Sequence, residues 1–125
     1  MKRILLLGLL FAALSAAQSV SNRAALVSFG TMSAAAASNS VNVSTLAPSK
    51  HTLQAIVTGS PTGCQIQLEG SLDNVNWFNL SGSQVCTANL QISVTERPES
   101  YIRVNLTTLS GGTSPTVTVT YTGVF

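Results

Sequence analysis

Hydrophobic and polar residues alternate strictly between Cys64 and Glu69, and this alternation predicts a half-buried strand. The segment 73–76 (D-N-V-N) follows, and its side chains favour a turn because they hydrogen-bond to their own backbone. Residues 77–80 (W-F-N-L) are then expected to return as a second strand. The stretch from Cys64 to Leu80 therefore predicts a β-hairpin with Cys64, Ile66 and Leu68 facing inward.

Similar alternation recurs through the rest of the chain after residue 41. Further strands are predicted over 41–46, 52–58, 85–95, 101–106 and 116–122. Gly, Ser and Pro are concentrated in the segments between them, where turns are expected. No helical periodicity appears in this region. Six or seven short strands in about 80 residues predict an all-β, two-layer antiparallel sandwich, either jelly-roll-like or immunoglobulin-like.

The N-terminal part of the chain has a different character. Residues 1–3 are basic at two positions, residues 4–14 are apolar, and residues 15–17 are small, which is the pattern of a secretion signal with a signal-like helix. A retained membrane anchor or a buried helix is the alternative, but the apolar run is shorter than the roughly 18 residues that span a bilayer. We expect cleavage before Gln18 and no stable membrane span in the mature form.

Residues 18–45 are rich in Ala, Ser and Asn and show no recurring apolar stripe. We predict a flexible arm or linker here, with a short strand at 26–29 whose partner could be another copy of the chain. The predicted organisation is thus a signal peptide-like segment at 1–17, an arm at 18–45 and a β-sandwich domain at 46–125.

Charged residues make up only 8% of the chain, about a third of the ordinary share, and neutral polar residues take their place. Outside the signal-like segment, four basic residues balance four acidic ones, and the basic residues do not cluster. We therefore expect no nucleic-acid partner, because binding the phosphate backbone requires clustered Lys and Arg. A neutral, hydroxyl-rich surface is typical of an extracellular or virion protein.

Two cysteines, Cys64 and Cys86, both have the inward parity of their predicted strands and lie 22 positions apart. An exported chain meets an oxidising compartment, so we expect a disulfide between them. Two buried free thiols are the alternative, since unpaired Cys packs as a small hydrophobe.

No group of residues predicts catalysis, a metal site or a cofactor, so we expect a protein that is not an enzyme. His51 has no Cys or carboxylate at ligand spacing and is predicted to be a solvated loop residue. If Phe78 and Leu80 face the core, Trp77 points outward. Trp77, Tyr101 and Arg103 are then the candidate ligand or interface residues, with a Trp packed over its neighbours as the alternative.

Three stretches resemble small β-sandwich proteins of tailed bacteriophages and prophages: residues 67–80 (QLEGSLDNVNWFNL), 97–106 (RPESYIRVNL) and 110–121 (SGGTSPTVTVTY). The resemblance covers roughly Lys50 to Phe125. It implies a non-catalytic structural or decoration component that packs against copies of itself or a larger shell. The signal-like N-terminus departs from virion proteins, most of which assemble in the cytoplasm.

Two functions follow as hypotheses. The leading one is a virion-associated or surface-assembly module whose arm reaches a neighbouring copy or a larger protein shell by β-augmentation. The alternative is a secreted glycan-binding or adhesion module that uses Trp77, Tyr101 and Arg103. The expected localisation is secreted, extracellular or in the virion.

Overall fold

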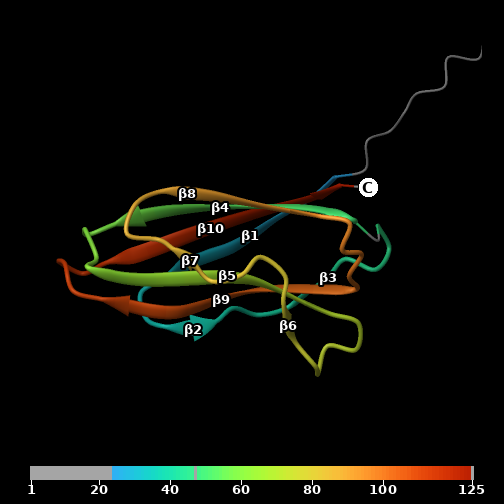
Figure 1. Ribbon diagram of the computed structural model, residues 1–125, viewed down its shortest axis with the longest axis horizontal. Helices are drawn as coiled ribbons and strands as arrows, with labels where there is room; N and C mark the ends of the chain where they lie inside the picture. Colours follow the sequence, from blue (N-terminus) through green and yellow to red (C-terminus); the bar gives the residue numbers. More distant parts are fainter. Residues whose placement is uncertain (1–23, 47, 125) are drawn as a thin grey trace, which may run out of the picture.

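The computed structural model describes residues 24–46 and 48–124, which form two antiparallel β-sheets stacked face to face (Figure 1). The predicted all-β sandwich is confirmed, and no helix occurs among the described residues. No described helix is long and apolar enough to span a membrane. The signal-like segment 1–17 and its expected helix lie outside the described residues.

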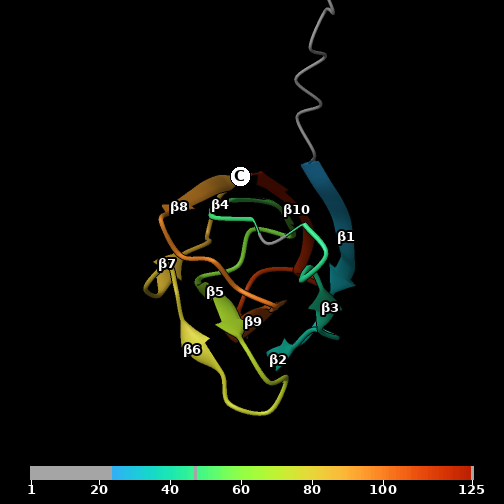
Figure 2. The ribbon, with the colours of Figure 1, turned by 90° about the vertical axis from the view of Figure 1, so that its right-hand side faces the viewer.

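Ten strands build the two sheets. They are β1 (Ala24–Met32), β2 (Ala36–Ala37), β3 (Val41–Asn42), β4 (Lys50–Thr58), β5 (Gly63–Ser71), β6 (Phe78–Asn79), β7 (Gln84–Val85), β8 (Leu90–Thr95), β9 (Tyr101–Ser110) and β10 (Thr116–Val124). One sheet has the order β1-β10-β4-β8 and the other β2-β9-β5-β6, with β3 also paired to β9 and β7 to β5. Figure 2 shows the two layers end-on.

The strand order identifies the sandwich as a jelly roll. Strands β2 and β3 form one interrupted edge beside β9, and β6 and β7 form another beside β5. When each such pair is counted once, eight strands remain, and the first pairs with the eighth, the second with the seventh, the third with the sixth and the fourth with the fifth. A chain folded double and then wrapped into two sheets gives this order.

The core lies between the sheets and consists of the alternate residues that the sequence pattern predicted. The side chains at most 1% exposed include Leu53, Ala55, Cys64, Ile66, Leu68, Ile102, Val104, Leu106, Val117, Val119 and Tyr121. The residues between them, many of them Thr, Gln and Asn, face outward. The period of two therefore determines which face of each long strand is buried.

The expected strand over 85–95 is wrong as a single element. Strand β7 belongs to the same sheet as β5, β8 belongs to the opposite sheet, and residues 86–89 cross between the two. Cys86 is buried in this crossing, whereas Ala88, which the alternation places inward, is exposed. The alternation continues through the crossing and so does not reveal the break.

The described part of the expected arm is also structured, which corrects that prediction. Residues 24–32 form β1, which pairs along its length with β10 of the same chain, and β2 and β3 join the other sheet. The expected strand at 26–29 exists, but its partner is within the chain. A β-bulge between Ser28 and Gly30, where Gly30 has φ 77°, shifts the inward parity, and this hides the amphipathic pattern from the sequence.

His51 lies in β4 and is 1% exposed, so its predicted place in a solvated loop is wrong. Its Nε2 is 2.6 Å from the carbonyl oxygen of Arg97, which can only accept a hydrogen bond. The neutral ring therefore carries its hydrogen on Nε2, and Nδ1 accepts from the hydroxyl of Tyr121 at 2.8 Å. Burial lowers the pKa of His51, and the bond to the Arg97 carbonyl opposes this only in part.

The predicted disulfide between Cys64 and Cys86 is confirmed, with the two Cα atoms 4.9 Å apart. The backbone N–H of Cys86 also donates to the carbonyl of Cys64 at 3.0 Å. The bridge therefore holds the start of the crossing 86–89 against β5.

Reducing this disulfide is expected to lower the free energy of unfolding by about 3 kcal/mol, because it frees a 22-residue loop in the unfolded chain. Urea unfolding of the oxidised and the reduced protein measures the difference. Ala88→Ser, an exposed change in the same crossing, serves as the control and should leave stability within about 0.5 kcal/mol of the unmodified chain. Equal midpoints for the oxidised and reduced forms would contradict a stabilising bridge.

Stability is expected to fall as the pH drops below 6.5, the ordinary pKa of histidine. The unfolded chain takes up a proton there, whereas the buried His51 of the folded chain does so only at lower pH, so acid favours unfolding. Urea unfolding at pH 7.5 and pH 5.5 tests this. Since His51 is the one histidine of the chain, His51→Gln should flatten the dependence in this interval; an unchanged slope would refute the assignment.

Candidate functional site

The outer face of the sheet that contains β5 and β9 carries the three candidate residues from the sequence. Arg103 lies on β9, and its guanidinium carbon is 4.3 Å from the centre of the Trp77 ring. Tyr101 lies two residues earlier on the same face of β9, beside Asn42 of β3 and Ser71 of β5. The structure thus brings Trp77 and Arg103 into contact and places Tyr101 next to them along the strand.

Glu69 organises this face, and the sequence alone did not single it out. Its side chain is largely buried, with Oε2 2.6 Å from Nε of Arg103. Oε1 accepts hydrogen bonds from Gln67 at 2.6 Å and from Asn105 at 2.9 Å. Glu69 and Arg103 are directly paired across β5 and β9. Their common outward parity was visible in the sequence, but the pairing of these two strands was not.

Glu69 is suited to holding its neighbours in place. Burial raises its pKa, but hydrogen bonds from Asn105, Gln67 and Arg103, together with the positive charge of Arg103, keep the pKa below its ordinary value. The carboxylate is therefore ionised at neutral pH and fixes the Arg103 guanidinium against Trp77. Gln67 extends the network, because its Oε1 accepts a hydrogen bond from Asn79 at 2.8 Å. An ordered array of amide, guanidinium and indole groups can bind a polar ligand or a polar protein surface.

The outward orientation of Trp77 was inferred on the condition that Phe78 and Leu80 face the core, but the Phe78 side chain is 65% exposed. It belongs to β6, a two-residue strand at the outer edge of its sheet (Figure 2), where an inward side chain is not covered. Leu80, two residues later, does pack against the core, and Trp77 is half-buried on the outer face.

The loop between β5 and β6 is a second candidate surface, and its backbone is held firmly. The Asp73 carboxylate accepts hydrogen bonds from the backbone N–H groups of Asn76 and Val75 at 2.8 and 2.9 Å, and from the Asn76 side chain at 2.7 Å. These bonds, led by that from the Asn76 backbone, hold the pKa of Asp73 far below its usual range. Ser71 Oγ accepts from the backbone N–H of Asn74, which has a left-handed φ of 61°.

Residues 72–78, the hairpin tip, display apolar side chains to solvent. Leu72 is 72% exposed, Val75 is 75% exposed and Phe78 is 65% exposed. The hairpin tip projects beyond the two sheets at the lower right of Figure 1. It is therefore a preorganised apolar protrusion.

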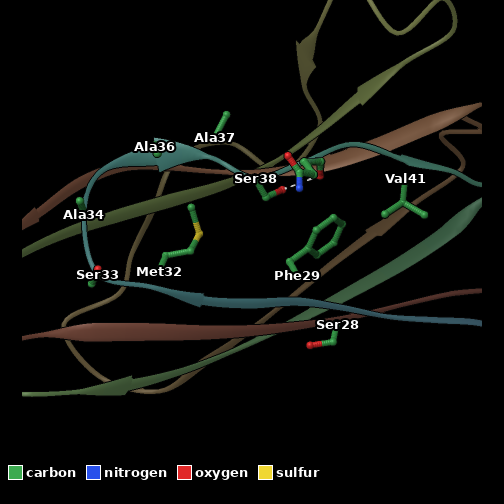
Figure 3. Close-up of a pocket in the computed structure, with 10 residues that line it drawn as sticks. Ser28, Phe29, Met32, Ser33, Ala34, Ala36, Ala37, Ser38 and Val41 are labelled. Carbon is green, nitrogen blue, oxygen red and sulfur yellow. Dashed lines mark hydrogen bonds between the residues drawn. The ribbon is translucent and has the colours of Figure 1, made fainter.

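A third feature, the side hollow, lies between β1 of one sheet and β2 and β3 of the other. Its volume is about 420 Å³. Figure 3 shows Phe29 and Met32 of β1 pointing into it from one side, and the turn through Ser33 and Ala34 closing one end. The complete lining is Ser28, Phe29, Met32, Ser33, Ala34, Ala36, Ala37, Ser38, Asn39 and Val41, none of which is charged.

Within the part of the chain that the structure describes, no three His, Cys, Asp or Glu side chains gather to form a metal site.

Comparisons with known proteins show similarity in fold. No protein-family model and no curated protein sequence matches this chain. Among solved structures, the SPBc2 prophage-derived protein YomS superimposes with a TM-score of 0.60 at 15% identity, over 82% of this chain and 94% of YomS. The PBSX exported protein XepA gives 0.58 at 15% identity, over 84% of this chain but only 39% of XepA. The resemblance to β-sandwich proteins of prophages is thus confirmed as a likeness of fold.

Proposed function

We propose that this chain is an exported, non-catalytic structural component of a phage or prophage assembly, which packs against copies of itself or a larger protein shell. The observation that carries this proposal is the hairpin tip with its three exposed apolar side chains. Apolar side chains gathered in one exposed loop are a feature of protein interaction sites, whereas apolar residues scattered singly are ordinary on protein surfaces.

The rigidity of the hairpin tip supports an interaction role. A loop that must become ordered on binding loses conformational entropy, whereas the hydrogen bonds to Asp73 and Ser71 already fix this one. An aromatic and two aliphatic side chains on a fixed protrusion have the composition of an interface anchor.

Several observations support the proposed phage origin and the proposed export. The two structural neighbours are described as prophage-derived and as exported. The Cys64–Cys86 bridge requires an oxidising compartment, which agrees with the signal-like residues 1–17.

A second candidate function is glycan binding. The observation that favours it is the cluster of Trp77, Arg103 and the side-chain amides around Glu69, because aromatic rings beside amide and charged groups suit the apolar and hydroxyl faces of a sugar. One face of the indole is occupied by Arg103, so a sugar ring would stack on the other face or displace the guanidinium.

Replacing Leu72, Val75 and Phe78 together with Ser is expected to reduce the fraction of protein that co-sediments with particles released from the source cells by at least about tenfold. Each lost apolar contact weakens binding by roughly the 1.4 kcal/mol that corresponds to a factor of ten. Ile56→Ser, an exposed apolar position on the opposite sheet, is the matched control and should co-sediment normally. A protein that never occurs in particles, or a triple variant that co-sediments fully, would contradict the proposal.

If the chain binds glycans, Trp77→Ala should abolish retention on a glycan array, because it removes the ring on which a sugar stacks. The triple hairpin-tip variant should be retained as well as the unmodified chain. Binding that survives Trp77→Ala would exclude this face as a sugar site.

A further inference from the structure

We propose that the hairpin tip of one copy of this chain binds in the side hollow of the next copy, so that copies join head to tail. This inference rests on the proposed function and specifies the partner and both contacting surfaces. It explains two features together: the exposed apolar side chains of the hairpin tip and the uncharged hollow between β1 and β2–β3.

The side hollow lies on the side of the sandwich where β1 of one sheet faces β2 and β3 of the other. On the side of β7 and β8, residues 86–89 cross between the sheets, and the Cys64–Cys86 bridge holds the start of this crossing against β5. On the other side, residues 33–35 connect the sheets at one end, and β1 and β2–β3 are not paired with each other. Phe29 and Met32 point into this gap and remain only partly buried (Figure 3). An inserted apolar side chain would complete their burial.

The charge distribution fits a contact between two copies. Residues 24–46, which form this entire side of the sandwich, contain no charged residue and no proline. Monomeric β-proteins protect their edge strands with charged side chains, Pro or β-bulges; β1 has the bulge between Ser28 and Gly30 but no charge and no Pro. The hairpin tip carries one charge, Asp73, and its carboxylate is already satisfied by hydrogen bonds from Val75 and Asn76. Burying the exposed apolar groups therefore leaves no new unpaired polar group.

The volume of the side hollow also fits the side chains of the hairpin tip. A hollow of about 420 Å³ lies at the small end of the range of roughly 300 to 1,000 Å³ that accommodates compact ligands. It can take one or two side chains such as Phe78 and Val75, but not a whole loop. Its serine and asparagine groups at the rim, among them Ser33 and Asn39, can pair with the polar backbone of the hairpin tip.

The geometry of this contact has a consequence for assembly. Each copy uses its hairpin tip once and its side hollow once, which is a heterologous contact, and such contacts generate closed rings or open filaments. A two-fold dimer through paired β1 edges is the competing arrangement. The head-to-tail contact and the two-fold dimer predict different oligomeric states when one variant has its hairpin tip blocked and a second variant has its side hollow blocked.

The test uses sedimentation velocity of the oxidised chain and two variants, each with one surface blocked. Val75→Glu blocks the hairpin tip and Ala36→Glu blocks the side hollow, and both positions are exposed, so the fold is retained. The unmodified chain is expected to form rings or filaments, and each variant alone is expected to be monomeric. A 1:1 mixture should form a dimer, because Ala36→Glu supplies an intact hairpin tip and Val75→Glu an intact side hollow. Ile56→Glu is the matched control and should assemble like the unmodified chain.

Several results would overturn the inference: an unmodified chain that is monomeric at concentrations on the order of 100 µM, single variants that still assemble, or a mixture that stays monomeric. A two-fold dimer insensitive to Val75→Glu would point to the β1 edges instead. A monomeric chain that still co-sediments with particles would refute the head-to-tail contact and leave the proposed function standing. Head-to-tail oligomers that never occur in particles would refute the proposed function alone.

Discussion

The disulfide between Cys64 and Cys86 holds β5 against the start of residues 86–89, one of the places where the chain passes from one sheet to the other. On the opposite side, β1 and β2–β3 face each other across a space that Phe29 and Met32 only partly fill. The two sheets are thus held together by their shared core and by chain crossings on both sides, at residues 33–35 and 86–89. The side hollow lies beside the first of these crossings.

The surface chemistry divides in the same way. On the outer face of β5 and β9, the charges and amides around Glu69 satisfy one another, so this face is polar, ordered and internally neutralised. The segment 24–46 carries no charge, and the hairpin tip exposes Leu72, Val75 and Phe78 to solvent. Apolar groups gain more than neutralised polar groups from contact with another molecule, because water is released from them at little electrostatic cost. We therefore expect the uncharged regions to mediate assembly and the polar outer face of β5 and β9 to take no part in it.

Much of the fold could be predicted from the sequence because long strands obey a strict period of two. Strands β4, β5, β9 and β10 lie where alternation placed them, with the expected inward residues. The errors occur where a tertiary feature overrides the local pattern: the bulge at Phe29 conceals β1, and the crossing 86–89 interrupts an alternation that continues through it. His51 was misplaced because its partner, Tyr121, is 70 residues away. Parity also indicated Trp77 and Arg103 as outward residues, but the role of Glu69 and the exposure of Phe78 depend on strand pairing.

Hydrogen–deuterium exchange of the oxidised chain, followed as the protein concentration is raised, tests most directly whether the side hollow and the hairpin tip make contact in solution. We expect the amides of residues 72–78 and of residues 33–41 to become protected together, over the same concentration range. The exchange of the amides of β8, on the opposite side of the sandwich, should remain unchanged. Protection that appears in one of these segments without the other, or an association that leaves both unprotected, would contradict the contact between them.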